Sequence, residues 1–499
     1  MQLDPDQKEV YDFLIKRYKK VNNQLLPGNC GWGKTFVGVN VALHMQTKEE
    51  RMILVFCPNI LMSMWSKSLE DLNIKTLMIC TYDKLAGKKS GCKHNLLTRK
   101  KNIYRQSSYW LKQKVFIICD ESQAIKNSKS ARHIAFFALI SKHPDCKVLH
   151  LTAAPIDKKD NWISLYRNMG LVNTSTLIYK NNYVDYGLGD VFEMAKQHDK
   201  KIITKLTEKY TIKKSNIPEI LQYLWKHIFR SLLVIQVKDP IYKHPITGQV
   251  FENNLCNFFA TLDKKGVQLV NEAMVDLGKA DIIKDGQVNA DKMKRNFGVV
   301  ILSLMKLCHA KITTIVRLSK AKLKSRKVII CCPFIDDQLL LYKSLEKYNP
   351  LLLNGTVKIS DRDDIVEKFN QPNNNYKVLI MTHDIGGEGI SLHDLDGRFP
   401  RTMFLIPTYH FLKMFQCAGR VYRRRMMSDV DINMIYSNNN MVESILVNLL
   451  AKTEVANDVL IPGSGRVFPG SWKYIIENEN ENHNELRTKL DEEQQKYKL

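Results

Sequence analysis

Residues 28–35 constrain the fold of this chain more than any other stretch, because they fit the pattern G-x-x-x-x-G-K-[ST]. The eight residues are Gly28, Asn29, Cys30, Gly31, Trp32, Gly33, Lys34 and Thr35. In such a loop the glycines let backbone N–H groups point at nucleotide phosphates, the lysine adds positive charge near the β- and γ-phosphates, and the threonine hydroxyl binds Mg²⁺. The apolar residues that follow predict a helix whose N-terminus also favours anions. We therefore expect a nucleotide-binding loop at a helix start.

An apolar run at residues 115–119 predicts a strand buried on both faces, and it ends in Asp120 and Glu121. Two carboxylates beside a phosphate loop suit metal-assisted phosphoryl transfer, in which one acid holds Mg²⁺ and the other orients and deprotonates the attacking water. We assign the first role to Asp120 and the second to Glu121. An ordinary helix start is the alternative for such a pair, and the upstream loop argues against it.

Short apolar runs alternate with helical spacing through the first third of the chain, and a second series of this kind begins at residue 328. The alternation predicts an α/β fold with a doubly wound parallel sheet, whose ligands lie at the carboxyl ends of the strands. We expect a first lobe over residues 1–170, a helical or irregular connecting region over 171–300, a second lobe over 301–460, and a polar, mobile tail over 461–499.

The charge balance favours a polyanionic partner. The 75 lysines and arginines exceed the 51 acidic residues, which gives a net charge of +24 and makes DNA or RNA a more natural partner than an acidic small molecule. A basic but otherwise ordinary surface is the alternative. Residues 88–105 hold seven basic side chains and are predicted to form an exposed loop, either solvated or in contact with phosphates.

Eleven cysteines are scattered along the chain without a C-x-x-C pair, which argues against zinc and disulfides and predicts a reducing, intracellular compartment. The N-terminus lacks an export signal, and no stretch approaches 18 uninterrupted apolar residues, so we expect no membrane span.

Near the end of the second series, residues 416–425 place arginines three and four positions apart, which predicts that they share one face of a helix. Such a face is normally solvated or turned toward nucleic acid. Beside a phosphate loop it could instead supply arginine fingers to the γ-phosphate.

In their order and spacing, these motifs resemble helicase superfamily 2, and in detail its Swi/Snf-related branch, over roughly residues 3–450. The matches are Gln7 as the family's adenine-reading glutamine, residues 28–35 as motif I, 57–65 as motif Ia, 81–83 as motif Ib, 120–123 as motif II, 152–155 as motif III, 353–369 as the motif IV region, 386–392 as motif V and 416–423 as motif VI. The run Asp-Glu-Ser-Gln-Ala-Ile-Lys-Asn at 120–127 is close to the Swi/Snf form.

The resemblance implies two RecA-like lobes that bind ATP between them and step along a nucleic acid. It implies that Lys34 and Thr35 bind phosphate and Mg²⁺, that Asp120 holds the metal, that Glu121 activates water, and that Arg420 and Arg423 act from the second lobe. The implied nucleotide-binding set comprises the whole of motif I together with Gln7 and Gly389. The implied nucleic-acid-contacting or coupling set comprises Pro58, Thr81, Gln123, Thr152 and Thr382.

The chain departs from the family pattern at several positions: Gln123 stands where many relatives have histidine, Trp32 replaces a small residue or leucine, and Ala153-Ala154 replaces Gly-Thr. These changes argue against nucleosome remodelling and suggest a compact, divergent member of the kind that large DNA viruses and linear plasmids encode.

We expect an ATP-dependent translocase or helicase that uses ATP and Mg²⁺, favours DNA over RNA, and acts in transcription with the transcription machinery as a partner. The expected location is the nucleus, or a viral factory or virion if the source is viral. The alternatives are an RNA or RNA–DNA helicase in transcript release, and a nucleotide-gated scaffold with little turnover. The sequence leaves the oligomeric state open.

Overall fold

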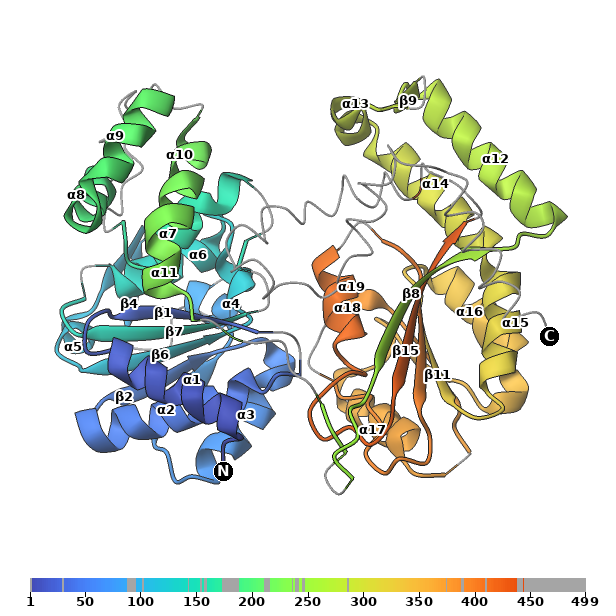
Figure 1. Cartoon of the computed structure of the whole chain (residues 1–499), viewed down its shortest axis with the longest axis horizontal. Helices are drawn as coiled ribbons and strands as arrows, with labels where there is room; N and C mark the ends of the chain where they lie inside the picture. Colours follow the sequence, from blue (N-terminus) through green and yellow to red (C-terminus); the bar gives the residue numbers. More distant parts are fainter. Residues whose placement is uncertain are drawn as a thin grey trace. The chain divides into compact units, whose positions relative to one another are not determined.

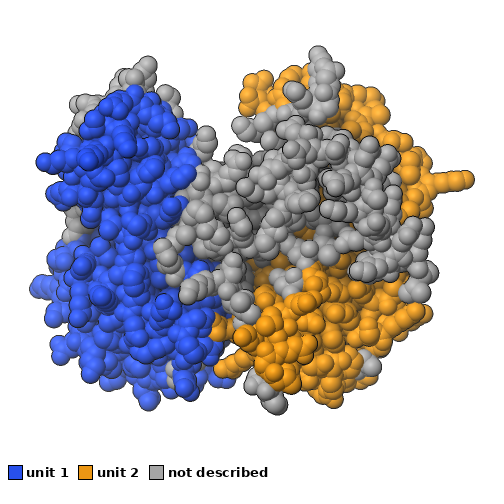
Figure 2. All heavy atoms as spheres, viewed as in Figure 1, with its two compact units in different colours: residues 1–241, 452–465 blue, residues 242–451, 466–499 orange. Residues whose placement is uncertain are grey.

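The chain divides into two compact units at residues 241 and 242 (Figure 2). The structure is a computed structural model, and the statements below concern the residues it describes: 2–28, 31–87, 96–100, 103–141, 143–152, 155–156, 159–172, 188–210, 216–235, 237, 242–244, 247–284, 287–373, 375–386, 390–408, 411–437 and 443.

Unit 1 is built on a five-stranded parallel sheet with the strand order β1-β7-β6-β2-β3. The strands are β1 (Asn23–Pro27), β2 (Met52–Phe56), β3 (Thr76–Cys80), β6 (Val115–Asp120) and β7 (Cys146–Thr152). Alternate residues of β6 enter two different cores: Phe116 and Ile118 pack on one face, and Ile117 and Cys119 on the other. Burial on both faces explains the uninterrupted apolar run that predicted this strand.

Helices cover both faces of this sheet (Figure 1). One face is packed by α1 (Pro5–Arg17), α2 (Lys34–Glu49) and α3 (Met62–Glu70), and the other by α4 (Tyr82–Ala86) and α6 (Ala131–Ile140). The short helix α5 (Ser108–Leu111) precedes β6.

The basic stretch at residues 88–105 is not simply a loop. Its described part forms the antiparallel strands β4 (Leu97–Lys100) and β5 (Ile103–Gln106), while 88–95, 101 and 102 lie outside the described residues. The alternation of apolar and polar residues that would predict such strands is short here. Leu97 of β4 and Tyr104 of β5 anchor the strand pair in the core.

The helices that follow the first sheet remain part of unit 1. They are α7 (Trp162–Asn168), α8 (Leu188–His198), α9 (Lys200–Lys209), α10 (Ile217–Leu224), the π-turn Trp225–Phe229 and α11 (Arg230–Leu233). Trp162, Trp225 and Phe229 share one core with Leu25 of β1, which ties these helices to the sheet.

Unit 2 contains a six-stranded sheet with the order β12-β13-β11-β14-β15-β8, and every neighbouring pair is parallel. The strands are β8 (Asn253–Ala260), β11 (Lys327–Cys331), β12 (Leu351–Leu353), β13 (Val378–Met381), β14 (Arg401–Leu405) and β15 (Val430–Ser437). Ile329 and Cys331 face one core of the unit, and Val328 and Ile330 face the other.

The helices of unit 2 are α12 (Lys264–Lys279), α13 (Ala290–Arg295), α14 (Phe297–Ala310), α15 (Ile312–Lys322), α16 (Ile335–Ser344), α17 (Ile359–Asn370), α18 (His383–Gly386) and α19 (Phe411–Ala418). A small hairpin of β9 (Ile283–Lys284) and β10 (Gln287–Val288) joins α12 to α13, and α12 packs on α14 in a core of their own (Figure 1).

The unit boundaries differ from the expected ones, because the region 171–300 is not a separate connector. Its first part packs with unit 1, and β8 is an edge strand of the second sheet. Residues 232–235 comprise the end of α11 and a single bridge between Val234 and Leu25. The expected tail, 461–499, lies outside the described residues.

In the described part of the chain, no single helix is long and apolar enough to cross a membrane; α14 and α15, bent by 43°, reach that length and apolarity only when taken together.

Candidate active site

The phosphate loop begins where the central strands of unit 1 end. Pro27, the last residue of β1, pairs with Thr152 at the end of β7, and Asp120 at the end of β6 pairs with Leu151. Residues 28, 121 and 152 therefore emerge at one edge of the sheet. This is the carboxyl edge, where α/β folds place their ligands.

Backbone geometry explains the glycines of the loop. Gly31 has φ 87° and Gly33 has φ 95°, both in the left-handed region that L side chains adopt at a cost. Gly33 is the N-cap of α2, so Lys34 and Thr35 occupy its first turn. Asn29 and Cys30 lie outside the described residues.

The side chain of Lys34 folds back over the loop, and its ammonium donates a hydrogen bond to the Gly28 carbonyl at 2.6 Å. A Cβ on Gly28 would lie 3.3 Å from Cγ of Lys34, so the glycine leaves room for this side chain. The sixteen-residue helix α2 begins at the same place, and its N-terminus favours negative charge there. Loop, lysine and helix start together form a cradle for an anion.

Gln7 lies against this loop. It is 3% exposed, and its amide donates to the Trp32 carbonyl at 3.2 Å and accepts from the Asp4 N–H at 3.1 Å. The Trp32 side chain is buried in the core with Val10 and Leu14 of α1, which anchors the loop to that helix. The location of Gln7 is thus established, and its reading of adenine stays a prediction.

Asp120 is buried at the end of β6, and its carboxylate accepts two hydrogen bonds, from the Trp65 indole at 2.8 Å and from the Glu121 N–H at 3.0 Å. Its pKa is raised to about 6, chiefly by burial and next by the neighbouring charge of Glu121. The Trp65 hydrogen bond and the positive charge of Lys34 oppose that rise. Because β1 and β6 both pair with β7, the phosphate loop and the acid emerge at the same edge of the sheet.

Glu121 has φ 49° and ψ 51°, a left-handed conformation that is uncommon for glutamate. Strained backbone of this kind persists where the surrounding structure fixes it, and it clusters at active sites. Here it turns the chain directly after the sheet and begins the 3-10 turn Ser122–Ile125.

A chain of side-chain hydrogen bonds joins Glu121 to the next strand. The Gln123 amide donates to Oε2 of Glu121 at 2.6 Å, and the Thr152 hydroxyl donates to Oε1 of Gln123 at 2.6 Å. Motifs II and III are therefore in direct contact, as their proposed coupling role requires. A glutamine serves here as both donor and acceptor, which explains how it can replace histidine.

Sequence reasoning missed two aromatic residues that support Asp120. Trp65 ends the stretch matched to motif Ia and was given no role of its own, yet its indole N–H donates to the carboxylate. Tyr82 donates its hydroxyl to the Asp120 carbonyl at 2.9 Å while its ring stacks on Phe56. The only sequence signal was that each follows a strand of the same sheet.

Pro58 and Thr81 follow the neighbouring strands β2 and β3. Pro58 precedes the 3-10 turn Asn59–Leu61, and the Thr81 hydroxyl accepts a hydrogen bond from Lys84 N at 3.2 Å as the N-cap of α4. Both lie at the carboxyl edge of the sheet. Their contact with nucleic acid stays a prediction.

The arginines of unit 2 do not share a helical face. Helix α19 ends at Ala418, and Arg420 and Arg423 lie in the irregular segment after it, because the chain turns at Gly419. Arg420 is 3% exposed, and Nη1 of Arg423 donates to the Ile390 carbonyl at 3.0 Å and to the Ser391 hydroxyl at 2.7 Å. Motif VI therefore packs on motif V.

Two other sequence-selected residues belong to unit 2. Thr382 lines a cavity of about 200 Å³ together with Pro333, Phe334 and Thr408. Gly389 lies outside the described residues. The action of Arg420, Arg423 and Gly389 on a nucleotide stays a prediction.

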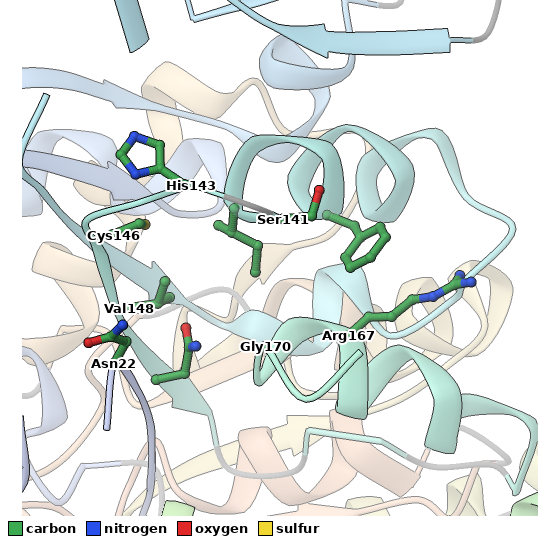
Figure 3. Close-up of a pocket in the computed structure, with 10 residues that line it drawn as sticks. Asn22, Ser141, His143, Cys146, Val148, Arg167 and Gly170 are labelled. Atoms are coloured by element: carbon green, nitrogen blue, oxygen red, sulfur yellow. The ribbon is translucent and has the colours of Figure 1, made fainter. Parts of the chain in front are cut away.

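A further cavity, of about 240 Å³, lies in unit 1 between β1, β7 and the ends of α6 and α7 (Figure 3). Asn22, Cys146 and Val148 mark the amino ends of the two strands, and the Arg167 guanidinium lies 5.1 Å from the Phe137 ring centre. Because it lies at the opposite end of the strands from the phosphate loop, this cavity is not part of the nucleotide site.

The site residues fit ATP with Mg²⁺. The loop offers backbone N–H groups and a lysine to phosphates, and Thr35 and Asp120 offer the hard oxygen ligands that Mg²⁺ requires.

Comparisons with known proteins agree with this arrangement. Residues 1–157 match the family model described as type III restriction enzyme, res subunit, and residues 310–425 match helicase conserved C-terminal domain. The SNF2 domain-containing protein ENL1 of Oryza sativa subsp. japonica is 20% identical over 521 residues, which cover 89% of this chain and 50% of that protein. The chain thus spans about half the length of this curated relative.

Among solved structures, the SWI2/SNF2 ATPase core of Sulfolobus solfataricus is similar both in complex with dsDNA and as the core domain by itself. Each is 17% identical with a TM-score of 0.33; the first match covers 95% of this chain and 96% of that one, and the second 93% and 92%. The fold assignment rests on the two parallel sheets rather than on this similarity. Residues 1–157 and 310–425 thus match, in order along the chain, one family model in each unit, a similarity that agrees with the expected resemblance to helicase superfamily 2.

Proposed function

We propose that this protein is a translocase that hydrolyses ATP to move along DNA. The observation that carries the proposal is the hydrogen-bonded path from Glu121 through Gln123 to Thr152. A change in the position of Glu121 on hydrolysis is transmitted along this path to β7, and through β7 to the rest of the sheet edge. Coupling of this kind converts a chemical step into motion when the conformations it links differ in energy.

The residues of unit 1 have distinct roles in the proposed reaction. Bound Mg²⁺ would neutralise charge on the phosphates, held by Thr35 and Asp120. Lys34 and the loop N–H groups orient the phosphates, and Glu121 accepts the proton of the attacking water. The hydrogen bond from Gln123 holds the Glu121 carboxylate in place for that step. We propose that Arg420 and Arg423 complete the site by stabilising charge on the γ-phosphate.

Two observations support nucleic acid as the partner, and DNA in particular. The net charge of +24 favours a polyanion, and residues 120–127 have the Swi/Snf form of motif II. A nucleotide-gated scaffold is disfavoured, because Lys34, Glu121, Arg420 and Arg423 are all retained. We further propose an intracellular role in transcription, in line with the divergent residues in its motifs.

Displacement of a third strand from a DNA triplex tests translocation directly. The full chain, with ATP and a duplex track leading to the triplex, should release the third strand, and Glu121→Gln should not. If the wild type releases the third strand only with single-stranded DNA, RNA or hybrid tracks, the protein is a helicase rather than a duplex translocase. Failure on every track, with ATP hydrolysis intact, would refute translocation.

A further inference from the structure

Three side chains from separate elements of unit 2 converge in its core. Cys308 lies near the end of α14, Cys332 directly follows β11, and Asp337 lies in the first turn of α16. Their sulfur and carboxylate oxygen atoms all lie within 4.8 Å of one another, and each residue is at most 3% exposed. The ATPase chemistry described above uses none of them.

The spacing of the two sulfurs fits a tetrahedral metal. With zinc–sulfur bonds of about 2.3 Å and tetrahedral angles, two thiolate ligands lie about 3.8 Å apart. The Sγ atoms of Cys308 and Cys332 are separated by 3.7 Å. A disulfide would require about 2.05 Å, so the pair is not bonded covalently; its separation is that of a thiol–thiol hydrogen bond and equally that of two ligands on one ion.

His309 contacts the Asp337 carboxylate on the side that faces solvent. Nδ1 of His309 lies 2.7 Å from Oδ1 of Asp337, and the His309 side chain is 32% exposed while that of Asp337 is 5% exposed. Hydrogen bonding of a ligating carboxylate by a neighbouring group is the usual second layer of a metal site. The half-exposed histidine also places solvent next to the site, which provides an entry path.

The charge of the ligand set suits a divalent cation. Two thiolates and a carboxylate would carry a charge of about −3, which a divalent ion reduces to about −1.

We propose that Cys308, Cys332 and Asp337 bind one zinc ion, with His309 orienting the Asp337 carboxylate. On binding, each thiol releases its proton to solvent and forms a sulfur–zinc bond, and no oxidation is involved. The fourth position of the tetrahedron is left to water. Because the ligands come from α14, β11 and α16, the ion stabilises unit 2 by joining these three elements. The proposal is independent of the proposed translocation.

Unit 2 offers a matched control. Cys331 and Cys417 form a second buried thiol pair, and Sγ of Cys417 donates to the His383 carbonyl at 3.3 Å. In the described part of the chain, the first cluster alone combines three ligand atoms at metal-binding distances. Because Cys331 and Cys332 face different cores of the unit, Cys331→Ser removes a buried thiol on the other side of the sheet from the proposed site.

The test is metal binding by the full chain, without an activity readout. After removal of metal with a chelator, wild type should bind one Zn²⁺ per chain against a chromophoric competitor. Bound Co²⁺ should give the intense visible bands of tetrahedral coordination with thiolate-to-metal charge transfer. Cys308→Ser and Asp337→Asn should abolish both signals, His309→Ala should weaken affinity by about 10- to 100-fold, and Cys331→Ser should change neither.

Thermal melts with and without Zn²⁺ distinguish a variant that has lost zinc binding from one that is merely less stable. Zinc should raise the melting temperature of wild type and Cys331→Ser, and leave that of Asp337→Asn unchanged. A wild-type protein that binds no zinc, a cobalt spectrum without thiolate bands, or equal loss of binding in Cys331→Ser would each overturn the proposal.

Discussion

Replacing Gln123 by alanine breaks both hydrogen bonds that link Glu121 to Thr152. The bond to the Glu121 carboxylate joins a neutral donor to a charged acceptor, which is worth about 1.5–3 kcal/mol when buried. Because both side chains are partly exposed, we discount this to about 1–2 kcal/mol. If the bond holds Glu121 in position for proton transfer, kcat with nucleic acid should fall about 5- to 30-fold.

Thr152→Val removes only the second link, between two neutral groups. We expect a smaller effect, about 2- to 13-fold in kcat, from a hydrogen bond worth about 0.5–1.5 kcal/mol. Since Thr152 acts on Glu121 only through Gln123, the double variant should be no slower than Gln123→Ala alone.

Steady-state ATP hydrolysis at saturating nucleic acid measures these effects. Gln106→Ala is a matched control, because the Gln106 amide also makes two hydrogen bonds, to the Leu139 and Ser141 carbonyls, far from the site. That variant should lose stability without losing kcat. Additive effects of Gln123→Ala and Thr152→Val, or a wild-type rate in Gln123→Ala, would refute the coupling path.

Three further predictions concern the same unit. Glu121→Gln should bind ATP and hydrolyse it at least about 100-fold more slowly, which single-turnover assays would show. Gly33→Ala places a side chain at φ 95°, at a cost of about 1–2 kcal/mol, and should weaken binding of a fluorescent ATP analogue by about tenfold; an unchanged affinity would contradict the loop geometry. Burial lowers the pKa of His150 from 6.5 to about 4, so the unfolded chain binds the proton first and stability falls as the pH drops from 6.5 to 4. At pH 5 the fall in the free energy of unfolding that His150 causes amounts to about 2 kcal/mol, and His150→Gln should abolish it. Chemical denaturation at several pH values measures this difference, and a pH profile equal to that of the wild type would argue against a neutral buried ring.

The sequence predicted the parts of the fold that depend on local patterns. Continuous apolar runs identified β6 and β11, because burial on both faces removes polar residues from a strand. The loop at 28–35 and the pair at 120–121 could be found because the residues that act together in each are consecutive in the sequence.

Long-range contacts were not predictable in this way. Trp65 lies 55 residues from Asp120, and only the parallel register of the sheet brings its indole to the carboxylate. The arginines of motif VI were placed on a helix because periodicity does not show that α19 ends at Ala418. The cluster of Cys308, Cys332 and Asp337 lacks the short-range cysteine spacing of common zinc sites, so its proximity appears only in the fold.

The most direct test of the central claim is the steady-state ATPase rate at one fixed salt concentration, measured without nucleic acid and with duplex DNA, single-stranded DNA and RNA in turn. We predict the strongest stimulation by duplex DNA, and none in Glu121→Gln. Stimulation chiefly by single strands or RNA would contradict the duplex translocase, and a wild-type rate unaffected by every nucleic acid would contradict the coupling of hydrolysis to nucleic-acid binding.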